Sequence, residues 1–100
     1  MTFKHLALIV ESTQATKQMK RVERALKDLF KKELKLSGKL TMTVKSQFEA
    51  EYEFFHDRVL DDKSFDAIIK DAEATLRSAD EEGHFHSVID GSGNPAEVLL

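Results

Sequence analysis

Two histidines near the end of the chain have the types and spacing needed to bind a metal ion. His84 and His86 flank Phe85, and residues two apart on a β-strand point to the same face, so both imidazoles could reach one cation. If the last strand lies beside the first, His5 would supply a third nitrogen. His-x-His is a loose pattern, however, and a half-exposed edge strand shows the same alternation. We expect no metal and no cofactor, and keep a metal-binding protein or small enzyme built on these three histidines as the alternative function.

Carboxylates are abundant, but their pattern is that of a solvated surface. They occur in the runs Glu49/Glu51/Glu53, Asp61/Asp62 and Asp80-Glu81-Glu82. General acid–base catalysis needs two carboxyl groups in different environments, one of them shielded from water. The chain also lacks a G-x-S-x-G nucleophile motif, and Ser37-Gly38-Lys39 lacks the upstream glycine of a phosphate-binding loop. We therefore predict that the protein is not an enzyme.

The charge of the chain changes sign along its length. Residues 17–39 hold nine basic and three acidic side chains, whereas residues 49–82 hold twelve acidic and four basic ones. Six of the cations fall on one face of the first predicted helix, namely Lys17, Lys20, Arg21, Arg24, Lys31 and Lys35. We interpret this face as the surface that docks a protein partner with an acidic surface.

Nucleic-acid binding through the same helix is a second alternative. Six cations suffice for several phosphate contacts. An RNA-binding sheet would also present aromatic rings on its open face, whereas Glu49, Glu51 and Glu53 make one face of the strand region acidic. The aromatic residues of that region share the opposite, apolar face and are expected in the core. Nucleic-acid binding is therefore disfavoured.

Hydrophobic periodicity predicts the elements that carry these groups. Phe3–Val10 is nearly all apolar and is expected to be an interior strand. A helix follows to about Lys35, and Ser37-Gly38 ends it. Its cap is expected at Ser12, Thr13 or Thr16. Its core-facing stripe consists of Met19, Val22, Leu26, Leu29 and Phe30.

Residues 40–54 alternate strictly between apolar and polar side chains. Period two over so long a run favours strand, either one long bent ribbon or two strands joined by a turn near Lys45–Gln47. No Gly, Pro or Asn marks such a turn, which weakens the hairpin interpretation. The rival is a strand Leu40–Lys45 followed by a helix that Ser46 caps, with Glu49 three residues on. The alternation favours strand, and it leaves open whether residues 46–60 are strand or helix.

The last third of the chain predicts a second helix and a final strand. The helix covers about Phe65–Glu82, with Ser64 as its cap and Gly83 at its end, and His84–Ile89 forms the strand. Asn94-Pro95-Ala96-Glu97 is expected to open a short terminal helix.

The order of elements predicts the fold class. It is strand, helix, one or two strands, helix, strand, which indicates an α+β fold. We expect a small sheet of three to four mainly antiparallel strands with two helices on one face, and favour the ferredoxin-like β-α-β-β-α-β arrangement. The chain is predicted to be a single domain over residues 1–100, with a short C-terminal tail at 91–100.

Composition bounds the class of protein. The chain is 41% hydrophobic and 33% charged, which is a globular balance, and it has no cysteine for a disulfide or a thiolate metal site. It has no apolar run of about 18 residues and no signal-peptide pattern, so we expect a cytoplasmic protein without membrane contact.

Together these features predict a non-enzymatic protein-binding module, a small adaptor or inhibitor. Small accessory proteins that phages or mobile elements direct against host factors are the analogy. We also expect a homodimer, because a long alternating strand invites pairing unless it is covered. Glu49, Glu51 and Glu53 would suit a symmetric contact with the basic helix of another subunit, and the apolar Val98-Leu99-Leu100 would fold onto that subunit.

Overall fold

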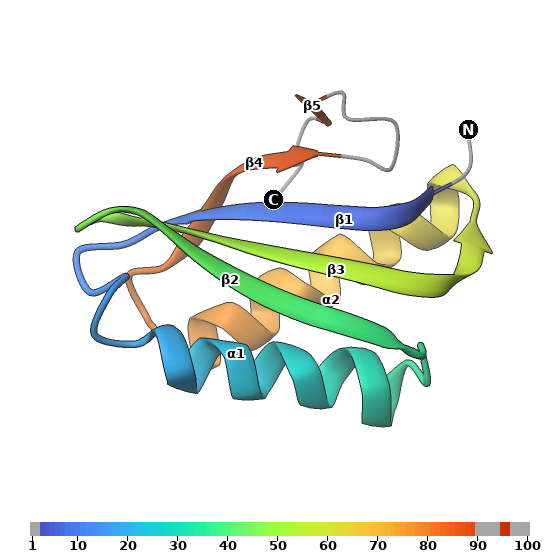
Figure 1. Cartoon of the computed structure of the whole chain (residues 1–100), viewed down its shortest axis with the longest axis horizontal. Coiled ribbons are helices and arrows are strands. Elements are labelled where there is room, and N and C mark those ends of the chain that lie inside the picture. The colour runs from blue at the N-terminus through green and yellow to red at the C-terminus, as the bar shows by residue number, and fades with distance from the viewer. Residues whose placement is uncertain (1–2, 90–94, 97–100) are drawn as a thin grey trace.

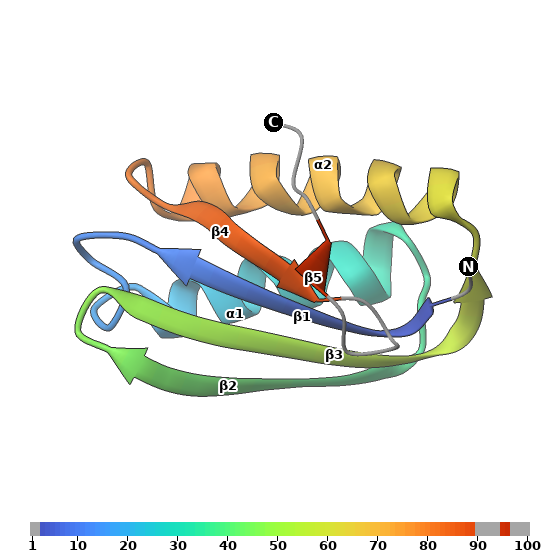
Figure 2. The ribbon, with the colours of Figure 1, turned by 90° about the horizontal axis from the view of Figure 1, so that it is seen from above.

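A single antiparallel sheet with two helices on one face forms the computed structural model of the chain, which describes residues 3–89 and 95–96 (Figure 1; Figure 2). The elements are β1 (Phe3–Glu11), α1 (Met19–Asp28), a π-helical turn η1 (Leu29–Glu33), β2 (Gly38–Ser46), β3 (Glu49–Leu60), α2 (Asp62–Ala79), β4 (His84–Ile89) and β5 (Pro95–Ala96). The strands lie in the order β2-β3-β1-β4-β5, and neighbouring strands are antiparallel. The predicted α+β class and the β-α-β-β-α-β order are confirmed.

The alternating segment forms a hairpin, as one of the two strand interpretations had it. β2 and β3 pair from Gly38 opposite His56 to Ser46 opposite Glu49, and Gln47-Phe48 make the turn. The backbone N–H of Phe48 donates to the Ser46 hydroxyl at 3.2 Å, so this serine supports a turn and the proposed helix cap is wrong. Lys45 is an extra residue in β2, because the pairing shifts between Val44 and Ser46.

The core lies between the helices and the sheet. Alternate residues of the strands point to the helices, and Tyr52, Phe30 and Phe54 are the largest fully buried side chains. The rings of Phe30 and Phe54 stack with their centroids 4.7 Å apart. The predicted stripe of the first helix is confirmed, since Val22, Leu26, Leu29 and Phe30 are buried and Met19 packs against them.

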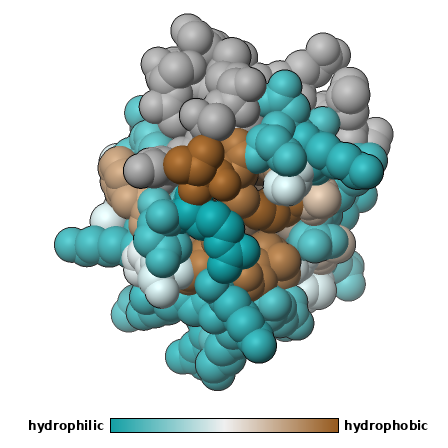
Figure 3. Space-filling view, turned by 90° about the vertical axis from the view of Figure 1, so that its right-hand side faces the viewer, coloured by the Kyte–Doolittle hydropathy of each residue, from teal (hydrophilic) through white to brown (hydrophobic). Residues whose placement is uncertain are grey.

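Several large apolar side chains are exposed, among them one that was expected in the core. Phe48 lies in the hairpin turn and is 47% exposed, and Phe55 on the open sheet face is 50% exposed. Val59, near the end of β3, is also half exposed. Figure 3 views the end of the molecule where α2 begins and shows apolar surface surrounded by hydrophilic groups. The expectation that the aromatic residues of 40–54 serve the core is confirmed for Tyr52 and Phe54 and wrong for Phe48.

The first helix begins and ends differently from the prediction. Its N-cap is Gln18, whose side chain makes no capping bond, whereas Ser12 donates to Asp80 instead. It passes into η1, and Lys35 then takes a left-handed conformation with φ 56°, the role predicted for Ser37-Gly38. Gly38 is needed for a different reason. A Cβ at this position would overlap the carbonyl oxygen of Phe55 on the paired strand.

The second helix and the C-terminal region also refine the prediction. Asp61 caps α2 by accepting from the backbone N–H of Ser64 at 2.8 Å, so the cap lies three residues before the serine that was expected to supply it. Pro95–Ala96 pair with β4 as β5, and the short helix predicted there is wrong at these two residues. The tail Val98-Leu99-Leu100 lies outside the described residues. Within residues 3–89 and 95–96, no helix is long and apolar enough to cross a membrane.

Candidate functional site

The outer face of α1 and η1 carries the predicted cluster of cations. Val22 and Leu26 turn toward the sheet, so helical spacing sends the basic residues to solvent. All six predicted cations (Lys17, Lys20, Arg21, Arg24, Lys31 and Lys35) are exposed, but Lys17 lies before the start of α1 and Lys35 after the end of η1, so four of the six lie on the helical segments. Among the described residues none of their side chains forms an ion pair or hydrogen bond. Lys32 differs, because its Nζ lies 3.7 Å from the Asp28 carboxylate.

The cations of α1 divide between two flanks of the helix. Arg21 lines a cavity of about 250 Å³ together with the end of α2 from Ser78 to Glu82, so its flank faces α2. Lys31 lines another cavity, of about 480 Å³, with Lys35 and Gly38 at the start of β2. Helical periodicity places three further cations on the same side as Lys31. We call this group the basic flank, and it consists of Lys20, Arg24, Lys27 and Lys31.

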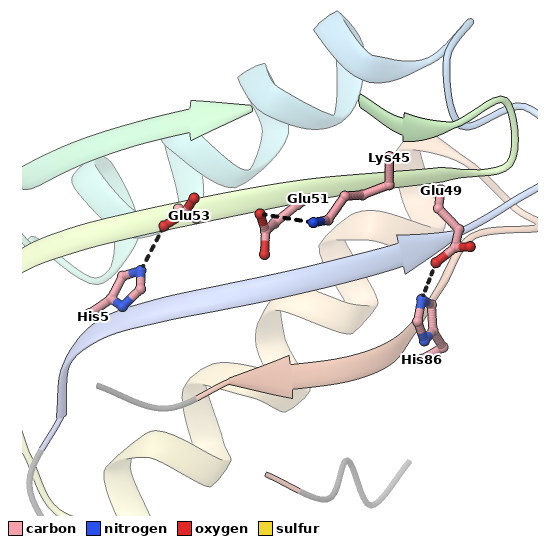
Figure 4. A network of polar contacts seen from close by, with 6 residues as sticks. All are labelled: His5, Lys45, Glu49, Glu51, Glu53 and His86. Carbon is pink, nitrogen blue, oxygen red and sulfur yellow. Dashed lines mark hydrogen bonds and ion pairs between the residues drawn. The ribbon is translucent and has the colours of Figure 1, made fainter. Parts of the chain in front are cut away.

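On the opposite side of the molecule, a row of glutamates crosses the open face of the sheet. Each carboxylate has a basic or imidazole partner (Figure 4). Glu53 lies 3.0 Å from His5, Glu51 lies 4.0 Å from Lys45, and Glu49 lies 2.7 Å from His86. These carboxylates were expected to be simply solvated, but they are half-buried and paired within the chain. They are therefore less available to a partner than the cations of α1.

The structure does not bring the three candidate metal ligands together. His5 lies opposite Phe55 and stacks on its ring at 4.2 Å, whereas His84 lies opposite Glu11, six residues further along β1. Six strand residues span about 20 Å. His86 is an extra residue where the β1–β4 pairing shifts, and it points to Glu49. Within the described part of the chain, no group of three or more His, Cys, Asp or Glu side chains could hold a metal ion.

Three buried polar groups were not anticipated. Glu73 on α2 accepts the backbone N–H of Phe85 at 3.1 Å and also pairs with Arg77. Asp80 accepts the Ser12 hydroxyl at 2.5 Å. These bonds tie the end of α2 to β4 and to the loop after β1, so their role is structural.

His56 is the third of these groups, and it is unsatisfied. It is only 6% exposed, and neither ring nitrogen has a hydrogen-bond partner among the described residues. Burial lowers the pKa of His56, because the charged imidazolium is poorly solvated there. Its position could have been found by continuing the apolar alternation of the hairpin two residues beyond Phe54.

A further cavity lies at the end of the sheet near the hairpin turn. It has a volume of about 430 Å³, and its lining includes Glu11, Glu49, Glu82, His84 and Phe48. Ser12 also lines it and donates its hydroxyl to the Asp80 carboxylate at 2.5 Å, whereas the carboxylates in the lining are solvent-exposed or only half-buried. The arrangement provides negative charge but no acid–base pair in contrasting environments.

The chain was compared with known proteins, and no family model, no curated protein and no solved structure matches it.

Proposed function

We propose that the protein is a non-enzymatic binding module, an adaptor or inhibitor, that docks an acidic protein partner through the outer face of α1 and η1. The observation that carries this proposal is the set of six exposed cations whose side chains have no ion-pair partner among the described residues. Such a concentration of like charge opposes folding slightly and favours association with an anionic surface. The glutamate row, by contrast, is paired within the chain.

Charge on the rest of the molecule favours a protein partner over nucleic acid. The net charge is −3, and the open sheet face carries Glu49, Glu51 and Glu53 where an RNA-binding sheet would stack bases. Phe55 is exposed on that face, but Glu53 lies beside it in β3. A nucleic acid that contacted α1 would therefore gain nothing from the sheet.

The test compares two anionic probes and two matched variants. Fluorescence anisotropy would measure binding of poly-L-glutamate and of duplex DNA at about 0.15 M salt, where charges separated by more than roughly 8 Å are screened. One variant carries Lys20→Glu with Lys31→Glu on α1. The other carries Lys63→Glu with Lys70→Glu on the exposed face of α2, which lowers the net charge by the same amount.

We expect poly-L-glutamate to bind and the α1 variant to bind at least about tenfold more weakly, while the α2 variant stays near wild type. If both variants lost affinity for poly-L-glutamate equally, net charge alone would explain the binding, and the proposal would be overturned. Tighter binding of duplex DNA than of poly-L-glutamate would replace it with nucleic-acid binding.

For the fold, we propose the ferredoxin-like arrangement. The order 2-3-1-4 of the first four strands and the placement of both helices on one face support it. We likewise keep a cytoplasmic location as a proposal, in line with the lack of cysteine.

A two-fold homodimer remains a prediction, but the structure changes the surface that could form it. The basic helix and the glutamate row lie on opposite faces of the molecule, so contact between them would run head to tail and would not close as a dimer. A two-fold contact must place one face against its own copy. Light scattering at micromolar concentration should report about twice the 11.4 kDa chain mass, and a monomer at all concentrations would contradict it.

A further inference from the structure

The edge strand β2 has the main features of a surface that accepts another strand. It is the outermost strand on the side away from β4, and within the described residues it pairs with β3 alone (Figure 2). Its pairing is regular from Gly38 to Val44, and it contains no proline. The other side of β2 therefore presents backbone N–H and C=O groups without strand partners, a pattern that an extended segment can pair with.

The side chains of β2 that point toward the helices are incompletely covered. Leu40 and Met42 pack against the core but are only half-buried, and Val44 is 56% exposed. An added strand would place alternate side chains beside these three residues on the same face of the sheet. Apolar residues at those positions would complete the burial.

The charge around this edge is positive. On the open face, Lys39 is exposed and has no ion pair among the described residues, and Lys45 is 47% exposed although it lies 4.0 Å from Glu51. β2 contains no carboxylate. On the helix face, the cavity lined by Lys31, Lys35 and Gly38 opens at the start of β2, and the basic flank of α1 continues from it. A segment with acidic side chains matches both faces.

A second copy of this chain matches the edge poorly. An antiparallel contact of two β2 strands centred on Met42 would set Lys39 of one copy opposite Lys45 of the other, and like charges directly opposite are destabilising. It would also place the basic flanks of both copies on the same face of one continuous sheet. Glu51 and Glu53 on the neighbouring β3 lie opposite Thr43 and Thr41, in the middle of β2. They would repel acidic residues in the middle of an added strand, so the acidic residues are expected at its two ends, opposite the lysines.

We propose that β2 receives an extended segment of the partner as an additional antiparallel or parallel strand, with apolar residues toward Leu40, Met42 and Val44 and acidic residues toward Lys39 and Lys45. This inference rests on the proposed function, because it names how an acidic protein partner engages the chain. The backbone of β2 supplies hydrogen bonds, the half-covered apolar side chains supply burial, and the lysines select the charge.

The experiment uses a capped seven-residue probe, Glu-Val-Thr-Val-Thr-Val-Glu, whose residues mirror the alternation of residues 39–45. Two control peptides separate charge from strand formation. Replacing both Glu by Lys keeps the strand-forming residues and reverses the charge. Glu-Gly-Ser-Gly-Ser-Gly-Glu keeps the charge and removes the strand-forming residues. Binding is followed by NMR titration, and amide hydrogen exchange of β2 is measured with and without each peptide.

We expect the probe to bind at least about tenfold more tightly than either control, and to slow exchange of the amides in residues 38–44 that point away from β3. Lys39→Glu should weaken the probe about three- to tenfold, whereas Lys70→Glu, an equal charge change on exposed α2, should not. Binding of the probe without slower exchange in β2 would overturn strand addition.

The two proposals can fail separately. If poly-L-glutamate binds through α1 but the seven-residue probe does not bind, strand addition is rejected and the proposed function stands. If neither probe binds, both fall. Slow exchange of the outward β2 amides that grows with protein concentration in the absence of peptide would show that a second copy occupies the edge, which also overturns the inference.

Discussion

The two halves of the molecule treat their polar groups differently. In the half built from α2 and β4, the helix cap and the buried carboxylates have partners: Asp61 caps the helix, Glu73 bridges Arg77 and Phe85, and Asp80 accepts from Ser12. In the half built from α1 and β2, the helix has no side-chain cap, six cations lack ion-pair partners among the described residues, and β2 ends the sheet. His56 lies opposite Gly38, and within the described part of the chain its ring has no hydrogen-bond partner.

This contrast indicates which half of the molecule can form new polar contacts on binding. Satisfied groups stabilise the fold and gain nothing from a partner. Exposed cations and edge backbone groups are hydrated in the free protein and can exchange water for the groups of a partner, whereas an unpaired buried group such as the His56 ring reduces stability. The two helices also differ in how their charges meet the helix dipole. α1 has Lys20 and Arg21 in its first turn, where positive charge is unfavourable. α2 begins with Asp62 and has Arg77 in its last turn, and both of these charges are favourable.

The largest stability effect is expected from the paired half. Glu73→Ala removes the acceptor of the buried Phe85 N–H and the partner of Arg77, so the free energy of unfolding should fall by about 2–3 kcal/mol in urea denaturation. Glu73→Gln keeps an acceptor and should cost less. Asp71→Ala, exposed on the same helix, should change stability by under about 0.5 kcal/mol. If Glu73→Ala and Asp71→Ala lowered the free energy of unfolding equally, the bonds of Glu73 would not stabilise this half of the molecule.

His56 should make the other half sensitive to acid. Burial lowers the pKa of its ring in the folded protein below the ordinary value of 6.5, so below that pH the unfolded chain binds more protons than the folded chain. The free energy of unfolding should therefore fall as pH decreases from 6.5 toward the folded pKa, by at most about 1.4 kcal/mol per pH unit. The backbone of Arg58 and the charge of Asp57 raise this pKa, and the charges of His5 and Arg58 lower it, each to a smaller extent than burial does.

The control for this prediction is His56→Phe, which keeps a ring beside Phe54 and removes the titrating group. Chemical denaturation from pH 5 to 8 would measure both proteins. Below about pH 6.5 the wild type should lose stability relative to His56→Phe, whereas above that pH the difference between the two free energies of unfolding should stay constant. A constant difference would show that His56 titrates normally in the folded protein.

Most of the fold could be predicted because it depends on periodicity. The alternation of residues 40–54 favoured strand, although it left a single ribbon and a helix from Ser46 open, and the stripe of Val22, Leu26, Leu29 and Phe30 identified the buried face of α1 and η1. Helix caps were harder, because a hydroxyl can bond a nearby backbone N–H without capping a helix and can also donate to a distant carboxylate, as Ser12 does with the N–H of Gln14 and with Asp80. Ser12 lies 68 residues from Asp80 in the chain, so the sequence near α1 could not reveal its partner.

The candidate site was predictable only in part. Helical spacing places Lys20, Arg24 and Lys31 on one exposed face, and the structure has them there. The separation of His5 from His84 depends on strand register, and the pairing of Glu49 with His86 depends on an extra residue in β4. Neither follows from local pattern. The exposure of β2 as an edge likewise depends on the order of strands in the sheet.

A smaller effect should come from the helix caps. Asp61→Ala removes the acceptor of the Ser64 N–H and should lower the melting temperature by about 4–8 °C at neutral pH. Gln18→Ala in the other half removes no capping bond and should shift it by no more than about 3 °C. Differential scanning calorimetry would compare the two. A larger fall in melting temperature for Gln18→Ala than for Asp61→Ala would show that the cap of α1, and not that of α2, stabilises the fold.

The smallest stability effect separates folding from binding. Lys20 and Lys63 are each the second residue of their helix and are exposed, so both meet the same end of a helix dipole. Lys20→Glu replaces an unfavourable charge there and places Glu four residues before Arg24, so the free energy of unfolding should rise by a few tenths of a kcal/mol. The same change should weaken binding of poly-L-glutamate, because it removes a cation from the basic flank. Lys63→Glu lies beside Asp62 and Asp66, so it should gain less stability and leave binding unchanged.

Denaturation and anisotropy on the same samples would measure both quantities. If Lys20→Glu lowered the free energy of unfolding, the cation at this position would not destabilise the free protein. If it left binding of poly-L-glutamate intact, the cation would not contribute to a binding surface. Either result would show that the contrast between the two halves has no functional meaning.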